Sequence, residues 1–352
     1  MMILQALQVE PSAGDESLEG MSSDDLLDKA EPLINRGQWD LAEKYLLQGL
    51  ENAEKESNSR NQIDSLLLLG RLCYSRGDLP QAMALNQQAL TLAKRISDRF
   101  LLGVIYDQMG TTYRMRGDYS QAIEYYKKSL EIHLDMGNEQ VMAVEYGNLG
   151  IVYSQQGGFE RAIQAYKKSL EYSTKLGMDQ YSARTHGNLG IIYYKQGQYH
   201  LAIEMYQQSL EITLRIDDQE QTANTYGNLG NVHLELGNYE QAIRMFQKAL
   251  EIYERIGDEP SIAHSYGNLA RVYHALGDVG QALAYYHKDL AITERIGDRH
   301  GAAISYFNLG NLYHEQGDMA QARAHYEKAR ALFEMVGDAQ NAQRAAQELR
   351  RL

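Results

Sequence analysis

The sequence YGNLGIVYSQQGGFERAIQAYKKSL, from Tyr146 to Leu170, decides the fold of this chain because it recurs every forty residues. The next copy starts at His186 and reads HGNLGIIYYKQGQYHLAIEMYQQSL. Further copies start at Tyr226 and Tyr266, and weaker ones near Leu66, Tyr106 and Tyr306. A fixed internal period of this length is the sequence signature of a solenoid, in which each repeat packs on its neighbours.

The composition favours a soluble, all-helical chain. Of the 352 residues, 44% are hydrophobic and 23% are charged, and only 4 are proline. β-Branched residues show little clustering, which argues against strands. Length alone would suggest about two or three domains, but the internal repetition favours one continuous array.

Charge and cysteine content restrict the partners and the compartment. The net charge of -13 argues against nucleic acid as a partner. The single cysteine, Cys73, excludes an internal disulfide and fits a reducing compartment. It stands where later repeats carry Tyr113, Tyr153 and Tyr193, so we expect it to be a buried filling residue.

Targeting features also point to the cytoplasm. No run of apolar residues reaches the roughly 18 to 20 that a membrane span needs. The opening MMILQALQV lacks the basic start and the long apolar run of a signal peptide. We therefore expect a cytoplasmic protein, with membrane contact only through this N-terminal segment if at all.

Glycines divide each repeat into two helices, A and B. Helix A is expected to end at a glycine in the left-handed backbone conformation, and these glycines are Gly77, Gly117, Gly157, Gly197, Gly237, Gly277 and Gly317. The residue that follows is usually Asp or Asn, which we expect to cap helix B. Most B helices end at a second glycine (Gly137, Gly177, Gly257, Gly297 and Gly337), with Ser97 or Asp217 in its place elsewhere.

The first repeat differs from the others. Ser22 is predicted to cap its first helix, with Asp24 and Asp25 in the first turn. Pro32 lies inside that helix and should kink or shorten it, because proline lacks the backbone N–H that a helix needs.

Small and large side chains share one face of helix B. Ala162 and Tyr166 are four residues apart and therefore lie on the same face, which Leu170 extends. The same slots hold Ala and Tyr or Phe in the repeats from Ala122 to Tyr326, and such a face needs a neighbouring helix. We therefore predict an all-α solenoid of about eight helix-turn-helix repeats.

The predicted organisation has three parts. A flexible, acidic N-terminal tail covers 1–21, and a polar capping helix covers 338–352. The eight repeats lie between them, at about 22–58, 59–98, 99–138, 139–178, 179–218, 219–258, 259–298 and 299–337.

The residues Leu149-Gly150-x-x-Tyr153, followed by Ala162 and Tyr166, make the unit resemble the tetratricopeptide repeat. The resemblance implies a right-handed superhelix with a concave groove lined by the A helices. The common period is thirty-four residues, so a period of forty implies longer helices. The Gly-Asn-Leu-Gly core with this period is similar to Pins-type spindle-orientation adaptors and, more loosely, to kinesin light chains, including the bacterial kinesin-light-chain-like proteins that work beside a tubulin-like filament.

Packing does not explain a Gly-Asn dipeptide in the middle of helix A. The asparagines are Asn148, Asn188, Asn228, Asn268 and Asn308, and the glycines before them are Gly147, Gly187, Gly227 and Gly267. The resemblance implies that the asparagines form a ladder that binds the backbone of an extended peptide. The alternative is that each one caps or bridges neighbouring helices. The glycines indicate either a close approach of adjacent A helices, which we favour, or a ligand backbone on the helix surface.

Other positions that the family analogy places in the groove vary between repeats, as specificity-determining residues do. The basic and amide members are Arg71, Arg114, Arg184, Lys195, Asn231, Arg271, His274, Asn311 and His314, and the acids are Asp64, Asp107, Glu235 and Glu315. Basic residues slightly outnumber acids, so an acidic extended segment is one expected ligand, and a solvated face of mixed charge is the equal alternative.

The sequence contains no motif for catalysis, cofactor binding or a metal site. Phosphate-binding loops, dinucleotide fingerprints, nucleophile elbows and H-E-x-x-H are all absent. His274 and His314 occupy equivalent slots, but surface histidines explain them more simply than a bridging metal. We therefore predict a non-enzymatic scaffold or adaptor for a protein or extended peptide. The alternatives are a protein bound to a tubulin-like filament and a regulatory sensor of a signalling peptide.

Overall fold

The computed structural model describes residue 18 and residues 20–352, so the predicted N-terminal tail lies almost wholly outside the described residues. The described part of the chain is helical, with no strand, as predicted. Its seventeen helices are α1 (Ser23–Asn35), α2 (Trp39–Lys55), α3 (Ser59–Ser75), α4 (Leu79–Ile96), α5 (Arg99–Met115), α6 (Tyr119–Asp135), α7 (Glu139–Gln155), α8 (Phe159–Lys175), α9 (Asp179–Lys195), α10 (Tyr199–Arg215), α11 (Gln219–Glu235), α12 (Tyr239–Ile256), α13 (Glu259–Ala275), α14 (Val279–Ile296), α15 (Arg299–Glu315), α16 (Met319–Met335) and α17 (Ala339–Arg351).

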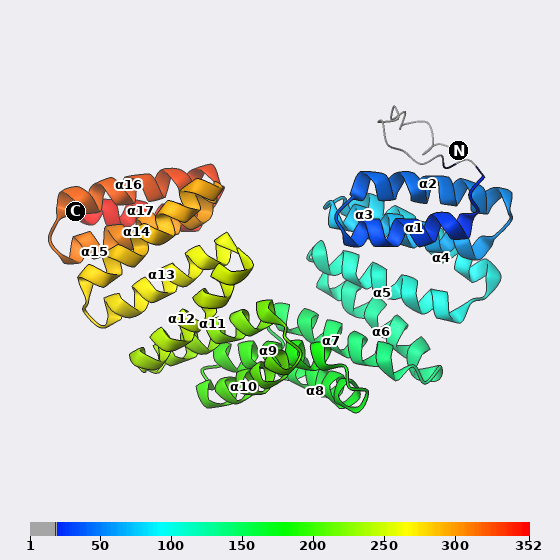
Figure 1. The fold of residues 1–352 in the computed structure, drawn as a ribbon, viewed down its shortest axis with the longest axis horizontal. Coiled ribbons are helices and arrows are strands. Elements are labelled where there is room, and N and C mark those ends of the chain that lie inside the picture. Colours follow the sequence, from blue (N-terminus) through cyan, green and yellow to red (C-terminus); the bar gives the residue numbers. More distant parts are fainter. Residues whose placement is uncertain (1–17, 19) are drawn as a thin grey trace. The chain divides into compact units, whose positions relative to one another are not determined.

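The chain divides into two compact units, one up to Lys168 and one from Ser169 to Leu352, here called unit 1 and unit 2. Within each unit an odd-numbered helix packs against the even-numbered helix that follows it, as α5 does on α6 and α13 on α14 (Figure 1). Each pair then packs on the next, so the units are stacks of helix pairs. The all-α solenoid is therefore confirmed.

The turns between helices have the predicted glycines in the left-handed conformation. At the end of α11 the φ of Gly237 is 72°, and the N–H of Asn238 donates to the carbonyl of His233 at 2.9 Å. Ser97 and Asp217 adopt the same conformation without being glycine, with φ of 54° and 56°. The predicted caps form at Asp78, Asp118, Asp278 and Asp318, but Asn238 makes no side-chain cap, so that prediction was wrong for Asn238.

Two expectations for the first repeats need correction. Ser22 caps α1 as predicted, in a reciprocal capping box with Asp25, but α1 runs on past Pro32 to Asn35. Helix α1 has 13 residues and α3 has 17. The difference arises because α1 begins later in the repeat, and not because it ends at Pro32. Cys73 is half-buried rather than buried, beside the core of the first repeats.

The second glycine of the Gly-Asn-Leu-Gly core is a packing residue. A Cβ added to Gly190 would lie 2.5 Å from the ring of Tyr206, and one added to Gly230 would lie 2.6 Å from the ring of Phe246. Both aromatic rings are almost fully buried. The ring of helix B therefore occupies the volume that a side chain at this position of helix A would need, which fixes the distance between the two helices.

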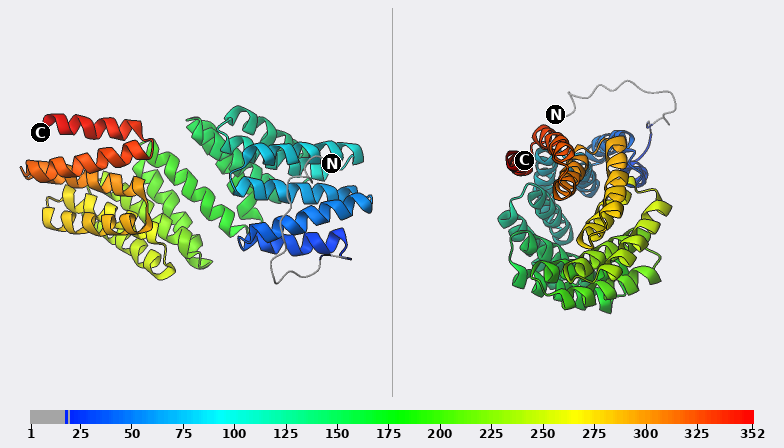
Figure 2. Two further views of the ribbon diagram at one scale, coloured as in Figure 1. Left: turned by 90° about the horizontal axis from the view of Figure 1, so that it is seen from above. Right: turned by 90° about the vertical axis from the view of Figure 1, so that its left-hand side faces the viewer.

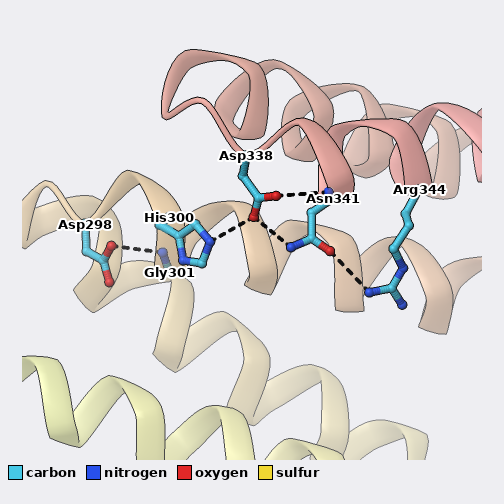
Figure 3. Close-up of polar contacts among 6 residues, drawn as sticks. All are labelled: Asp298, His300, Gly301, Asp338, Asn341 and Arg344. Atoms are coloured by element: carbon cyan, nitrogen blue, oxygen red, sulfur yellow. Dashed lines mark hydrogen bonds and ion pairs between the residues drawn. The ribbon is translucent and has the colours of Figure 1, made fainter. Parts of the chain in front are cut away.

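Helix α17 ends the stack of unit 2 beside α16 (Figure 2). Only Ala342 and Ala345 are buried in it, so its other face is polar. A chain of polar contacts fastens its start to α15: His300 contacts Asp338 at 3.1 Å, and Asn341 donates to Asp338 at 2.7 Å (Figure 3). Arg344 continues the chain by donating to the side-chain oxygen of Asn341 at 3.2 Å.

Candidate functional site

The odd-numbered helices of unit 2 form one side of its stack, here called the A-helix side. Each of them contacts the next odd-numbered helix directly: α9 contacts α11, α11 contacts α13, and α13 contacts α15. Gly-Asn dipeptides lie in the middle of α9, α11 and α13, and α15 has Phe307-Asn308 at the same place. Asn188, Asn228 and Asn308 are half-buried, whereas Asn268 is buried.

The glycines that precede the asparagines do not serve close packing of the backbones. A Cβ added to Gly227 would have no atom within 4 Å. One added to Gly187 would lie 3.3 Å from the side-chain nitrogen of Gln221, and one added to Gly267 would lie 2.9 Å from a carboxylate oxygen of Asp289. None of the three would meet the backbone of another helix, and only Gly187 faces a side chain of the next A helix. The favoured prediction of a close approach between A helices was therefore wrong at Gly227 and Gly267.

The asparagines divide into paired and unpaired amides. In unit 1, Asn148 donates to Asp107 of the previous A helix at 3.1 Å, so the bridging alternative holds at that position. In unit 2, Asn268 accepts from Arg271 at 3.3 Å. The side-chain amides of Asn188, Asn228 and Asn308 make no hydrogen bond within the described part of the chain. The open amides of the predicted ladder therefore lie in α9, α11 and α15.

The remaining predicted residues are scattered over both units. Arg71, of α3, contacts Asn35 and Glu31, and Arg114, of α5, lies near Asp107 and Tyr126. Arg184 and Lys195 are exposed in α9, and the Arg184 guanidinium lies 4.5 Å from the centre of the Tyr181 ring.

On the A-helix side of unit 2, several predicted residues have partners from neighbouring helices. His274 contacts Glu315 at 2.6 Å across α13 and α15, and Glu235 accepts from Tyr194 at 3.4 Å. Asn311 accepts from Tyr326 at 2.7 Å. Asn231 and His314 are half-buried, and their side chains make no hydrogen bond or ion pair with other described residues.

Two cavities open on the A-helix side of unit 2. The first, of about 210 Å³, is lined by residues of α13, α14 and α15, including Gly267 and Asp289. The second, of about 470 Å³, is lined by residues of α11 to α15, including Glu235 and His274. Arg271 and Asn308 line both cavities, so the structure brings these two predicted residues together at one place.

Sequence reasoning missed two buried acids. Glu145 is fully buried in α7, where Ser129 donates to it at 2.5 Å, and Asp289 is 8% exposed in α14. Burial, and then the charge of Asp107, raise the pKa of Glu145 well above its usual range. A comparison of slots could have found both, because the slot of Glu145 holds Thr or Ser in later repeats and that of Asp289 holds Gly, Ala or Ser in earlier ones.

Within residues 20–352 no group of three or more His, Cys, Asp or Glu side chains could hold a metal ion. The described residues also include no helix with the length and apolar character needed to cross a bilayer.

Sequence comparison identifies the repeat. The family model described as "Tetratricopeptide repeat" matches residues 26–95, 87–135, 101–175, 181–255 and 261–335, and a second model with that description matches residues 228–293. No curated protein matches the whole chain significantly by sequence.

Several solved structures share the fold. The apo form of RapI is 18% identical with a TM-score of 0.70, over 94% of this chain and 97% of its own. The apo quorum sensor NprR of B. thuringiensis is 18% identical with a TM-score of 0.68, over 88% of this chain and 87% of its own. BtubC (BKLC) of P. vanneervenii is 22% identical with a TM-score of 0.54, over 64% of this chain and 91% of its own.

Proposed function

The chain belongs to the tetratricopeptide repeat family, and we propose that it is a non-enzymatic scaffold that binds an extended segment of a partner protein on the A-helix side of unit 2. The segment would run from α9 across α11 and α13 to α15, with its backbone against the Gly-Asn dipeptides of the first three helices. The proposal places this interaction in the cytoplasm, as the single cysteine indicates.

The open space above Gly227 carries this proposal. Glycine inside a helix is less stable than alanine by roughly 1 kcal/mol, and a methyl group at Gly227 would meet no atom of another helix within 4 Å. Stability alone would therefore favour alanine. A ligand backbone lying directly on the helix surface gives a reason for the glycine, because a Cβ would hold that backbone away from Asn228.

The unpaired amides fit the same ligand. An amide side chain offers two N–H donors and one oxygen acceptor, so it can pair with the C=O and N–H groups of any extended peptide, whatever its sequence. Asn188 and Asn228 stand forty residues apart in successive A helices, and neither amide has a partner within the described residues. Together with Gly227 they would bind backbone, and the varied residues around them would select the sequence.

The similar structures support a peptide or protein partner. One of them is a Rap protein solved in complex with the competence and sporulation factor, 16% identical with a TM-score of 0.58 over 94% of this chain. Another is the quorum sensor NprR. The peptide-responsive sensor predicted as an alternative is a special case of the present proposal, in which binding also changes the pitch of the stack.

A filament-associated role is the second candidate, since BtubC (BKLC) shares the fold. Binding to a tubulin-like polymer would use the exposed faces of the even-numbered helices. Substitutions in the Gly-Asn dipeptides would then leave co-sedimentation with the polymer unchanged.

Selection from a library tests the main proposal. The full chain, immobilised, is used to enrich random peptides of twelve residues, and the enriched peptides are titrated against the wild type and the double variant Asn188→Ala/Asn228→Ala. If each lost amide pairing costs roughly 1 kcal/mol, affinity should fall about tenfold or more while helicity stays the same. The double variant Gln207→Ala/Gln247→Ala removes two exposed amides from α10 and α12 and serves as the control. Failure to enrich any peptide, or equal affinity for both double variants, would refute binding at the dipeptides.

A further inference from the structure

The cavity of about 210 Å³ in unit 2 has a buried floor and an exposed rim. Ala263, Asn268, Asp289 and Thr293 form the floor and are all at least nine-tenths buried. The rim includes exposed residues such as His264 and Arg271, so the cavity opens to solvent beside the Gly-Asn dipeptide of α13 and Asn308 of α15.

Asp289 is a buried acid without a basic partner. Ser305 donates to its Oδ2 at 2.6 Å. The same oxygen lies beside Gly267, where a side chain would leave it no room. No Lys, Arg or His side chain forms an ion pair with it within residues 20–352. Burial raises the pKa of Asp289 to about 6, although the Ser305 hydrogen bond opposes this shift. The carboxyl group is therefore mainly ionised at neutral pH, and an unpaired buried charge is unfavourable.

The charges around the cavity sum to a negative value. Burial, and then the charge of Arg271, lower the pKa of His264, so its ring is neutral at pH 7. Asp289 and Asp298 then carry two negative charges against the one positive charge of Arg271. A cation entering the cavity would balance this charge.

The corresponding place in unit 1, 160 residues earlier, is filled by the protein's own side chains. There Asn148 donates to Asp107, Asp107 interacts with Glu145, and Ser129 donates to Glu145. These four residues form a continuous chain of polar contacts from α7 to α5 and α6.

In unit 2 the same four slots hold Asn308, Gly267, Ser305 and Asp289. Ser305 and Asp289 still pair with each other, at 2.6 Å. Gly267 supplies no side chain, however, so nothing joins Asp289 to Asn308, and the amide of Asn308 stays unpaired among the described residues. Both residues line the cavity that takes the place of the missing group.

We infer that this cavity binds a basic side chain, of arginine or lysine, from the extended segment, with Asp289 as its ion-pair partner and Asn308 donating to a carbonyl of the same segment. The inference rests on the proposed function and adds a side-chain preference to it. The excess of basic residues among the variable positions predicted a segment that is acidic along its length. The present inference concerns a single residue of that segment, the one that enters the cavity, and predicts that this residue is basic.

Parallel selections test the inference. The random twelve-residue library is enriched on the full-length wild type and on Asp289→Asn and Asp289→Ser, the second of which restores the residue found at Ser129 and Ser209. The control Glu211→Gln removes one negative charge from the exposed face of α10 in the same unit, away from both cavities. Helicity and melting temperature show that each variant is folded, and both Asp289 variants should melt no lower than the wild type.

Peptides enriched on the wild type and on Glu211→Gln should carry Arg or Lys at one fixed position, and the Asp289 variants should not select it. Replacing that residue of the peptide by glutamine should weaken binding to the wild type about thirtyfold or more, and should change binding to Asp289→Asn less than threefold. Two results would overturn the inference: dipeptide-dependent peptides without a preferred basic residue, or the same loss of preference in Glu211→Gln. In both cases the proposed function would stand. If no peptide is enriched on the wild type, both proposals fail.

Discussion

The substitution Gly227→Ala separates packing from binding. The added methyl group would meet no other atom within 4 Å, and the backbone at Gly227 is ordinary α-helix, so no strain opposes the change. Alanine is favoured over glycine in a helix by roughly 0.5–1 kcal/mol. A change of about 1 kcal/mol shifts the melting temperature of a domain of 150–250 residues by roughly 2–4 °C, and unit 2, from Ser169 to Leu352, is of this size. We therefore expect the melting temperature to rise by about 1–4 °C.

The same methyl group should weaken binding. It would lie beside Asn228 on the surface where the ligand backbone is proposed to rest, so the affinity for an enriched peptide should fall about tenfold. That corresponds to roughly 1.4 kcal/mol, about the value of one lost hydrogen bond. Thermal melts followed by circular dichroism give the first quantity, and titration of a labelled peptide gives the second.

A matched control lies three residues further along the same helix. Gly230→Ala would place a Cβ 2.6 Å from the Phe246 ring, so the ring or the helix must move. Ala270 fills the equivalent slot beside Tyr286, which shows that such a shift is possible, and we expect a lower melting temperature than that of Gly227→Ala. A melting temperature that falls in Gly227→Ala would refute the open-space argument. A rise without any loss of peptide affinity would refute the binding role of the glycine.

Three further predictions concern pH and the capping helix. Because the pKa of Glu145 is raised, its carboxyl group keeps a proton in the folded state that it loses in the unfolded state as pH rises from about 4, so the wild type becomes less stable. The variant Glu145→Gln has no such proton to lose, so its melting temperature should exceed that of the wild type by a margin that widens between pH 5 and 8. The exposed control Glu131→Gln should show no such widening. Burial lowers the pKa of His133, whose two ring nitrogens have no partner among the described residues. The unfolded state therefore takes up a proton at His133 first as pH falls through about 6.5, and the folded protein loses stability. The variant His133→Leu should flatten that part of the curve of melting temperature against pH. Backbone and side-chain hydrogen bonds from Asn341, followed by the contact with His300, lower the pKa of Asp338. The variant Asp338→Ala should speed hydrogen exchange of the backbone amides in α17. The wild type should approach the exchange rate of the variant only when the pH falls below the usual pKa range of an aspartate.

The period of forty residues was enough to predict the helices, because one sequence pattern marks both the turns and the buried faces. Gly237 ends its helix whatever lies around it, since its left-handed conformation is a local property. Tyr206 and Gly190 belong to one packing contact, and both recur with the repeat, so pattern and structure agree there.

The site could be predicted only in part, because equal residues have unequal surroundings. Asn148 and Asn188 occupy one slot of the repeat, yet only Asn148 meets an acid on the preceding A helix. Gly227 and Gly230 are both glycine in the same motif, but one faces open space and the other an aromatic ring. These differences depend on the neighbouring repeat, which the pattern of a single repeat does not contain.

The slot of these glycines also indicates where binding along unit 2 should end. Gly187, Gly227 and Gly267 fill it in α9, α11 and α13, but in α15 it holds Phe307. The Phe307 ring packs against Tyr326 with centroids 5.6 Å apart, and the Arg344 guanidinium lies 5.4 Å from its centre. A backbone resting on the glycines would meet this aromatic side chain after α13. Asp289 and Asn308 line the last cavity before it, so the residue of the segment that reaches them has the most enclosed surroundings and should contribute most to specificity.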